Sequence, residues 1–156
     1  MTTKRTRTAD ALTGLILEVF RLNGLLLMAG DRMVARLGLT SPRWQVLRAI
    51  YDAERAQPVA WLARDMGGNR QNVQRIVNDL QKMGFVILEA NPHHRRASLV
   101  VLTEKGRRTY DEASRLQAPW ANRLSEDLAI KDIDTTRRVV AALRKKLELN
   151  DERASP

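Results

Sequence analysis

The sequence predicts a mainly α-helical protein that carries one small β-hairpin. Over most of the chain, apolar residues recur every three or four positions, which is the spacing of an amphipathic helix. The spacing changes only after Gly84, where two short β-prone runs, FVILEA and ASLVVL, flank a polar segment. With 156 residues, of which 44% are hydrophobic, the chain fits one domain with a substantial core.

The charge balance is strongly basic. The formal net charge is +9, and a basic balance of this size makes an anionic polymer such as nucleic acid an expected partner. The sequence contains no cysteine, which excludes disulfides, thiolate metal sites and cysteine-based redox sensing. We therefore expect a cytoplasmic protein.

The first predicted helix spans residues 10–36. Basic residues followed by an apolar run superficially resemble a signal peptide or a membrane span here, but Glu18, Arg21 and Asn23 interrupt the run. We expect a long soluble helix with more than one buried face, preceded by a disordered basic arm over residues 1–8. The apolar positions that step by three or four are Leu12, Leu15, Val19, Leu22, Leu26, Ala29 and Met33.

The next elements form a helix-turn-helix. A helix is predicted to begin at Ser41, which precedes a proline and has the chemistry of an N-cap, and to end near residue 53. Residues 58–83 then read as a short helix, a turn at Gly67–Gly68 and a longer helix that Asn69 can cap. This order is the helix-turn-helix arrangement.

The longer helix of this pair, NRQNVQRIVNDL at residues 69–80, has an unusual polar face. Amide and guanidinium side chains occupy it, whereas Glu and Lys are the usual residues of a solvated helix. Each of these groups can make two parallel hydrogen bonds to the edge of a base. Two alternatives stay open, namely an ordinary polar surface and, for Arg75, an ion pair with Asp79. The opposite stripe is apolar and comprises Val73, Ile76, Val77 and Leu80.

A basic hairpin follows this helix. Residues 91–96, NPHHRR, join the two β-prone runs, and an Asn-Pro pair with basic residues is typical of a hairpin tip. A helix-turn-helix followed by such a hairpin is a winged helix. Two further helices are predicted to begin at Thr103 and at Asp132, each with an apolar stripe.

The ordered segments LTSPRWQVLRAI, VAWLARDMG, NRQNVQRIVNDLQKMGFV and NPHHRRASLVVLTEKG resemble the MarR family of bacterial winged-helix regulators. The resemblance implies a single domain over residues 1–156. It would consist of a winged DNA-binding lobe at about 40–104 and dimerisation helices at about 10–36 and 105–148. It also implies a homodimeric repressor of a palindromic, inverted-repeat operator. A small ligand, often phenolic or aromatic, would release the DNA after binding between the dimer helices and the lobe.

Carried onto matching positions, the resemblance implies DNA contacts from three elements. Ser41 and Arg43 match positions that commonly touch phosphate. Arg96, with Arg95 beside it, matches the wing arginine that enters the minor groove. The chain departs from the family pattern at His94, where an acid usually orients that arginine. The recognition helix would supply Asn69, Arg70, Gln71, Asn72, Gln74 and Arg75.

The resemblance also suggests a ligand pocket. Each of its candidate lining residues is more often found in core or lobe packing than in contact with a ligand. Trp61 falls off the apolar stripe of its own helix, so it is either partly exposed or packed on the first helix. The candidates are Met28, Arg32, Trp44, Tyr51 and Tyr110.

The sequence gives no support for an enzyme, a cofactor or a metal site. Ser98, Ser114 and Ser125 have no His or Asp at a recognisable spacing, and there is no Gly-rich phosphate loop. His93 and His94 are adjacent on a turn, with no clustered acid to complete a metal site. The alternative to a ligand-responsive repressor is a non-specific architectural DNA-binding protein. The amide-rich helix favours the repressor, because phosphate binding needs only Lys and Arg.

Overall fold

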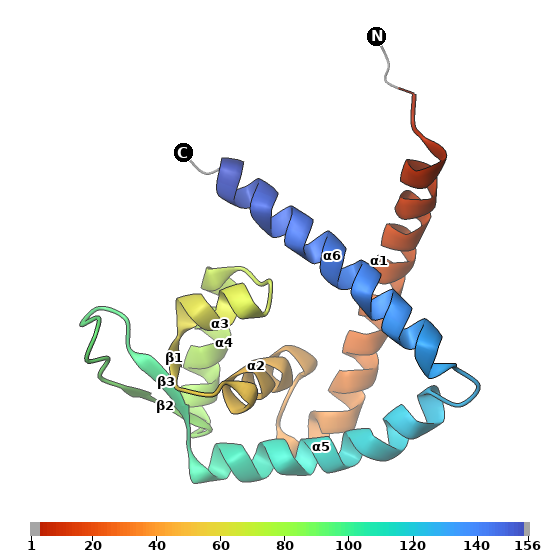
Figure 1. The fold of residues 1–156 in the computed structure, drawn as a ribbon. Coiled ribbons are helices and arrows are strands. Elements are labelled where there is room, and N and C mark those ends of the chain that lie inside the picture. The colour runs from red at the N-terminus through yellow and green to blue at the C-terminus, as the bar shows by residue number, and fades with distance from the viewer. Residues whose placement is uncertain (1–3, 155–156) are drawn as a thin grey trace.

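The computed structural model describes residues 4–154 and confirms the predicted mainly helical fold (Figure 1). Helices flank a lobe in which a helix-turn-helix is followed by a β-hairpin. The elements in order are α1 (Arg7–Val34), the 3₁₀ turn η1 (Ala35–Leu37), α2 (Ser41–Asp52), β1 (Gln57–Pro58), α3 (Val59–Asp65), α4 (Arg70–Lys82), β2 (Val86–Glu89), β3 (Leu99–Leu102), α5 (Glu104–Leu124) and α6 (Ile130–Ala154).

The amino-terminal arm is shorter than predicted. Residues 1–3 of it lie outside the described residues, but the chain is helical from Arg7 onward. The helix begins there because the Thr6 hydroxyl accepts a hydrogen bond of 3.1 Å from the Ala9 backbone N–H, which satisfies one of the free donors of the first turn.

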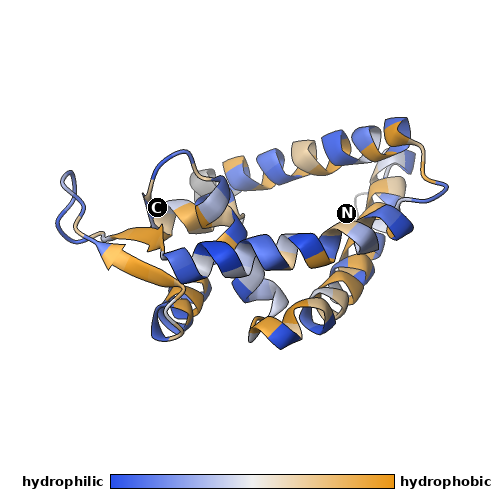
Figure 2. Ribbon diagram, turned by 90° about the horizontal axis from the view of Figure 1, so that it is seen from below, coloured by the Kyte–Doolittle hydropathy of each residue, from blue (hydrophilic) through white to orange (hydrophobic). Residues whose placement is uncertain are grey.

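The wing is an antiparallel sheet in the strand order β1-β3-β2. Val86 pairs with Leu102 and Glu89 with Leu99 across the hairpin. The short strand β1, in which Gln57 pairs with Val100, adds a third strand that sequence periodicity did not predict. Figure 2 shows hydrophobic strands that end in a hydrophilic hairpin tip.

The core lies inside the lobe, where α2, α3 and α4 pack together and against the sheet. Leu47, Leu62, Leu80 and Val100 are completely or almost completely buried there. The tight turn between α3 and α4 depends on Gly67, whose φ of 64° is in the left-handed region that glycine adopts at little cost. This turn sets the angle between α3 and α4 within the lobe.

The start of α2 differs from the prediction. Thr40, not Ser41, is its N-cap, and the Thr40 hydroxyl accepts from the Arg43 backbone N–H. Ser41 is already helical, and its own backbone N–H donates to the Asp31 carboxylate of α1 at 2.6 Å. The cap therefore moves by one residue, because a side chain ten positions earlier takes up the Ser41 N–H.

The start of α5 is locked onto the end of the recognition helix. The Thr103 backbone N–H donates to the Phe85 carbonyl at 3.0 Å, and the Thr103 hydroxyl donates to the Gly84 carbonyl at 2.7 Å. Gly106 packs directly against the Phe85 carbonyl, where any Cβ would overlap it. The first turns of α5 thus belong to the lobe.

The amino-terminal part of α1 extends away from the lobe, whereas α6 runs back from the end of α5 toward α3 (Figure 1), and its Arg144 side chain lies close to Gly67. Phe20 is 69% exposed and Ile130 is 78% exposed. By length and hydropathy alone, residues 7–37 would pass as a membrane span, and the most apolar window of this stretch has no buried residue. The other strongly exposed apolar side chains of these two helices are Leu17, Leu22, Leu25, Met28, Leu147 and Leu149.

Candidate nucleic-acid interface

The predicted recognition helix is α4. The Asn69 side chain caps it by accepting a 3.1 Å hydrogen bond from the Asn72 backbone N–H. The predicted apolar stripe is buried, and the polar residues opposite it are exposed or half-buried. The predicted DNA-facing residues on this helix and at its cap are Asn69, Arg70, Gln71, Asn72, Gln74 and Arg75, of which only Gln74 is half-buried.

Side chains on this exposed face pair with one another. The Arg75 guanidinium donates from Nη2 to Asn72 Oδ1 at 2.9 Å. One turn away, Gln74 Nε2 donates to Asn78 Oδ1 at 2.9 Å. The alternative ion pair between Arg75 and Asp79 does not form in this structure, because Asp79 has a different partner.

That partner is Arg43, one of the two residues predicted to touch phosphate. Its Nη2 lies 3.1 Å from Asp79 Oδ2, which ties α2 to α4. Ser41, the other, is 5% exposed and lies against Gly30 of α1. The close packing of α1 on α2 covers the Ser41 hydroxyl, so a phosphate contact from Ser41 would require this packing to open.

A groove of about 150 Å³ joins the recognition helix to the wing. Arg70 and Gln74 of α4 line it on one side, and Arg96 of the wing lines it on the other. Two guanidinium groups around one opening, with no acid among the lining residues, favour a phosphate group. The remaining lining residues are Pro58, Val59, Ala60, Leu88, Ala97 and Ser98.

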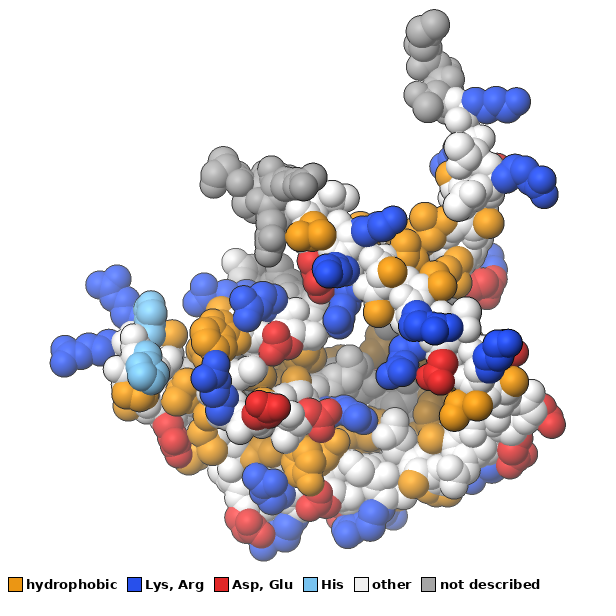
Figure 3. Space-filling model, in the orientation of Figure 1, with side chains coloured by type: hydrophobic (Ala, Val, Ile, Leu, Met, Phe, Trp, Pro, Cys, Tyr) orange, Lys and Arg blue, Asp and Glu red, His pale blue; other side chains and the backbone are white. Residues whose placement is uncertain are grey.

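The wing tip is held by Asn91, which sequence reasoning did not single out. Its Nδ2 donates to the Ala97 carbonyl at 2.9 Å, and its Oδ1 accepts from the His93 backbone N–H at 3.0 Å. Among the described residues, Arg96 has no acidic partner within 4 Å. Histidine and arginine side chains stand exposed at the tip, at the far left of Figure 3. An amide thus fixes the backbone of a wing whose usual acid is replaced by His94.

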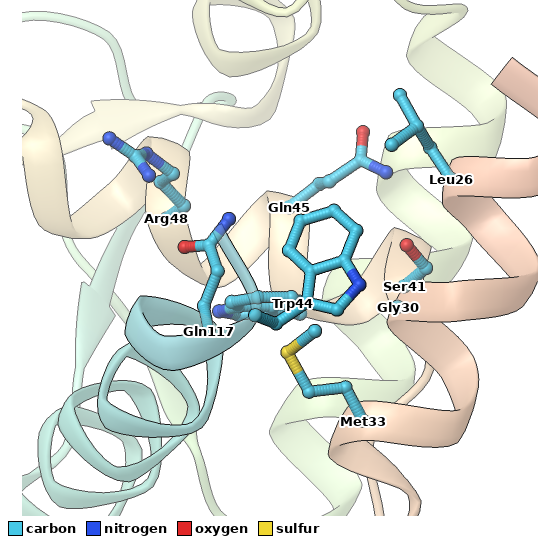
Figure 4. A pocket seen from close by; sticks show the side chains of 9 residues that line it. Leu26, Gly30, Met33, Ser41, Trp44, Gln45, Arg48 and Gln117 are labelled. Carbon is cyan, nitrogen blue, oxygen red and sulfur yellow. The ribbon is translucent and has the colours of Figure 1, made fainter. Parts of the chain in front are cut away.

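A second cavity, of about 210 Å³, lies between α1, α2 and α5 (Figure 4). Trp44 is buried beside it, and its indole Nε1 has no hydrogen-bond partner among the described residues. A buried donor without a partner is costly, so a bound acceptor would be favoured there. The lining residues are Leu26, Gly30, Met33, Ser41, Trp44, Gln45, Arg48, Gln117 and Trp120.

Only Trp44 of the five predicted ligand residues lines this cavity. Tyr51 and Tyr110 pack against each other instead, with ring centroids 4.3 Å apart. Met28 and Arg32 are exposed elsewhere on α1. These four lie outside this cavity because the sequence prediction placed residues by element, whereas the cavity is set by how α5 crosses α1 and α2.

Trp61 is partly exposed, which settles an open alternative. It is 42% exposed, and the guanidinium groups of Arg55 and Arg64 lie 5.7 and 5.8 Å from its ring centroid. Cation–π contacts of this kind explain how a large aromatic side chain is accommodated at the surface of α3.

Comparison with known proteins gives similarities in sequence and in fold to transcriptional regulators. A family model described as "MarR family" matches residues 37–97. An uncharacterized protein of Mycobacterium tuberculosis is 39% identical over 140 residues, covering 87% of this chain and 96% of that protein. The transcriptional activatory protein BadR of Rhodopseudomonas palustris is 27% identical over 126 residues, covering 78% of this chain and 71% of BadR. The M. tuberculosis transcriptional regulator MOSR, solved in complex with DNA, superposes with a TM-score of 0.73 at 24% identity, covering 86% of this chain and 96% of MOSR.

Proposed function

The chain belongs to the MarR family of transcriptional regulators, and from this premise we propose that it is a homodimeric, sequence-specific repressor of inverted-repeat operators. The observation that carries the proposal is the groove where Arg70 and Gln74 of the recognition helix meet Arg96 of the wing. A phosphate of the DNA backbone fits this groove, since two guanidinium groups can contact it. With a phosphate there, α4 lies in the major groove and the wing tip reaches the minor groove.

The dimer is supported by the apolar surface of α1 and α6. A monomer that exposed Phe20, Leu25, Ile130 and Leu147 together would carry far more apolar surface than soluble monomers tolerate. A second copy, contributing its own residues 10–36 and 105–148, covers this surface by two-fold symmetry. The same dimerisation accounts for the hydropathy of α1 in a cytoplasmic protein, without a membrane. Two-fold symmetry then requires half-sites whose centres lie about 10 bp apart.

Ligand control is supported by the cavity between α1, α2 and α5. The cavity lies where α1 and α5 pack on α2 of the lobe. Beside it, the hydrogen bond from the Ser41 N–H to Asp31 ties α1 to α2. A ligand there would shift the angle between the lobes if it bound one dimer shape more tightly than the other. Lined by Trp44 and Trp120, with Arg48 and two glutamines, the cavity favours a small aromatic ligand with acceptor oxygens.

The alternative is a non-specific architectural DNA-binding protein. A competition gel shift at fixed salt separates the two functions. Promoter DNA from the neighbourhood of the gene is compared with random DNA of equal length. A repressor is expected to prefer one promoter by about 10³-fold or more, whereas an architectural protein would bind both DNAs equally. Added transcription assays then establish the direction of control, since the relative BadR is named an activator.

The wing gives a prediction of its own. Arg96→Ala is expected to lower the slope of log affinity against log salt by about one unit, because one phosphate contact is lost. Asn91→Ala is expected to weaken operator binding several-fold with little change in slope, because the charge remains but the tip loses its two hydrogen bonds. Anisotropy titrations over a salt series measure both. Arg55→Ala, an exposed position outside both the proposed dimer surface and the groove, is the control. If Arg96→Ala gives the same salt slope as this control, the proposed wing contact is contradicted.

The cavity gives a second prediction. Aromatic carboxylates are screened by thermal shift and then for release of operator DNA. For a compound that does both, Trp44→Phe is expected to weaken binding by about 1–3 kcal/mol, because the ligand's acceptor loses the indole N–H. Tyr51→Phe, outside the cavity, is expected to leave binding unchanged. Thermal stabilisation without DNA release would show that the cavity does not control the DNA.

A further inference from the structure

Only some of the polar residues of α4 lie at the centre of its exposed face. Successive residues of a helix are rotated by about 100°, so the positions directly opposite the buried stripe are Gln71, Arg75, Asn78 and, at the end of the helix, Lys82. All four are exposed. Asn72 and Gln74 lie at the two flanks. Gln74 faces the groove shared with the wing, and Asn72 lies on the side where Asp79 pairs with Arg43 of α2.

Each flanking amide is bonded to one central side chain. Asn72 Oδ1 accepts from Arg75 Nη2, and Gln74 Nε2 donates to Asn78 Oδ1, both at 2.9 Å. The first bond leaves the remaining N–H groups of the guanidinium available in a fixed orientation. The second leaves the Asn78 amide two N–H donors and a second lone pair on Oδ1, with donor and acceptor ends assigned by its partner.

These two fixed groups match two particular bases. A guanidinium presents paired donors to O6 and N7 of guanine, and an asparagine amide presents a donor and an acceptor to N7 and N6 of adenine. The two residues are three positions apart, about 4.5 Å along the helix axis. Base pairs are stacked about 3.4 Å apart, so the two bases read would be neighbours or separated by one pair.

We propose that Arg75 and Asn78 are the base-reading residues, directed at a guanine and a nearby adenine, and that Asn72 and Gln74 are positioning residues that fix their orientation. The proposal rests on sequence-specific DNA binding by α4. It adds Asn78 to the readers, and it moves Asn72 and Gln74 from base contact to support.

The readers are tested by selecting DNA from a random-sequence duplex library with the full chain. The unchanged protein is expected to enrich half-sites that contain the guanine and the adenine within two base pairs. Arg75→Ala should lose the preference for that guanine, and Asn78→Ala the preference for that adenine, each by roughly 5- to 150-fold. Gln81→Ala, an exposed amide farther along the same helix, is the matched control and should keep both preferences.

The positioning role of Asn72 and Gln74 is tested with conservative variants. For each variant, discrimination between single bases and affinity for random DNA are measured. Asn72→Asp keeps the acceptor, so it should retain the guanine preference while its added negative charge weakens binding to all DNA. Asn72→Ala should lose several-fold of the preference. Gln74→Glu cannot donate to Asn78 Oδ1, so it should reduce the adenine preference, as Gln74→Ala does.

Base analogues complete the test. Replacing the guanine by 7-deazaguanine removes N7 and should weaken the unchanged protein but not the Arg75→Ala variant. Preferences that survive in both Arg75→Ala and Asn78→Ala would overturn the assignment of readers, and unaltered discrimination in Asn72→Ala and Gln74→Ala would overturn the assignment of support. Failure of the unchanged protein to enrich any sequence would instead refute the proposed specific binding itself.

Discussion

A Phe20→Asp variant is expected to be monomeric at micromolar concentration and to bind an inverted-repeat operator at least about 100-fold more weakly than the unchanged protein. Phe20 is the most exposed large apolar side chain of α1. In a dimer it would be buried, and a carboxylate buried there without a partner is strongly unfavourable. The loss in DNA binding follows because two linked lobes bind with an effective concentration that separate lobes lack.

Sedimentation equilibrium measures the oligomeric state directly. Leu147→Asp, at an exposed apolar position of α6, is expected to give the same result. Ile87→Asp is the matched control, because Ile87 is an apolar residue of the wing with 45% exposure and lies outside the proposed dimer surface. That variant is expected to remain dimeric. A dimeric Phe20→Asp protein would show that α1 does not form the interface.

The second large effect is expected at Gly106. Its replacement by alanine should reduce the free energy of unfolding by about 3 kcal/mol or more, because the added Cβ overlaps the Phe85 carbonyl oxygen. This oxygen belongs to backbone, and it also accepts from the Thr103 N–H. Relief of the overlap therefore requires the start of α5 to move away from the end of the recognition helix. The neighbouring bond from Lys105 Nζ to the Met83 carbonyl, at 2.7 Å, would be lost with it.

Urea denaturation followed by circular dichroism gives the free energy of unfolding. The control is Arg108→Ala, at an exposed position two residues farther along α5. This variant should change the free energy of unfolding by no more than about 0.5 kcal/mol. Equal midpoints for Gly106→Ala and the unchanged protein would show that the junction between α4 and α5 is not closely packed. If Gly106→Ala also lowers the affinity for operator DNA, the junction between α4 and α5 helps to orient the recognition helix.

The features that depend on local patterns were predictable from the sequence. The apolar stripe of α4 and the hairpin runs have the spacing of their elements, so both appear where they were expected. The strand β1 has only two residues, which is too short for any period. Other differences depend on contacts between distant segments. Asp31 takes the Ser41 N–H, and Asp79 is held by Arg43; neither pairing can be read from nearby residues.

The candidate site likewise has features that were predictable from the sequence and features that were not. The residue types of the recognition helix and the basic tip were visible in the sequence, but their pairing was not. Residues three and four positions apart on a helix are all neighbours, so residue types alone do not say which pairs form. The structure pairs Asn72 with Arg75 and Gln74 with Asn78. The cavity residues Gln117 and Trp120 come from α5, and their place beside Trp44 depends on where α5 crosses α2. Such crossings are set by tertiary packing and leave no local signature.

Hydroxyl-radical footprinting of the complex on the promoter that binds best tests the central claim most directly. A dimer that reads an inverted repeat with α4 should protect two half-sites related by a two-fold axis, with centres about 10 bp apart. Protection should extend into the flanking minor groove, and Arg96→Ala should reduce that flanking part more than the protection of the half-sites. A single protected half-site, or uniform protection that follows no sequence, would contradict the account.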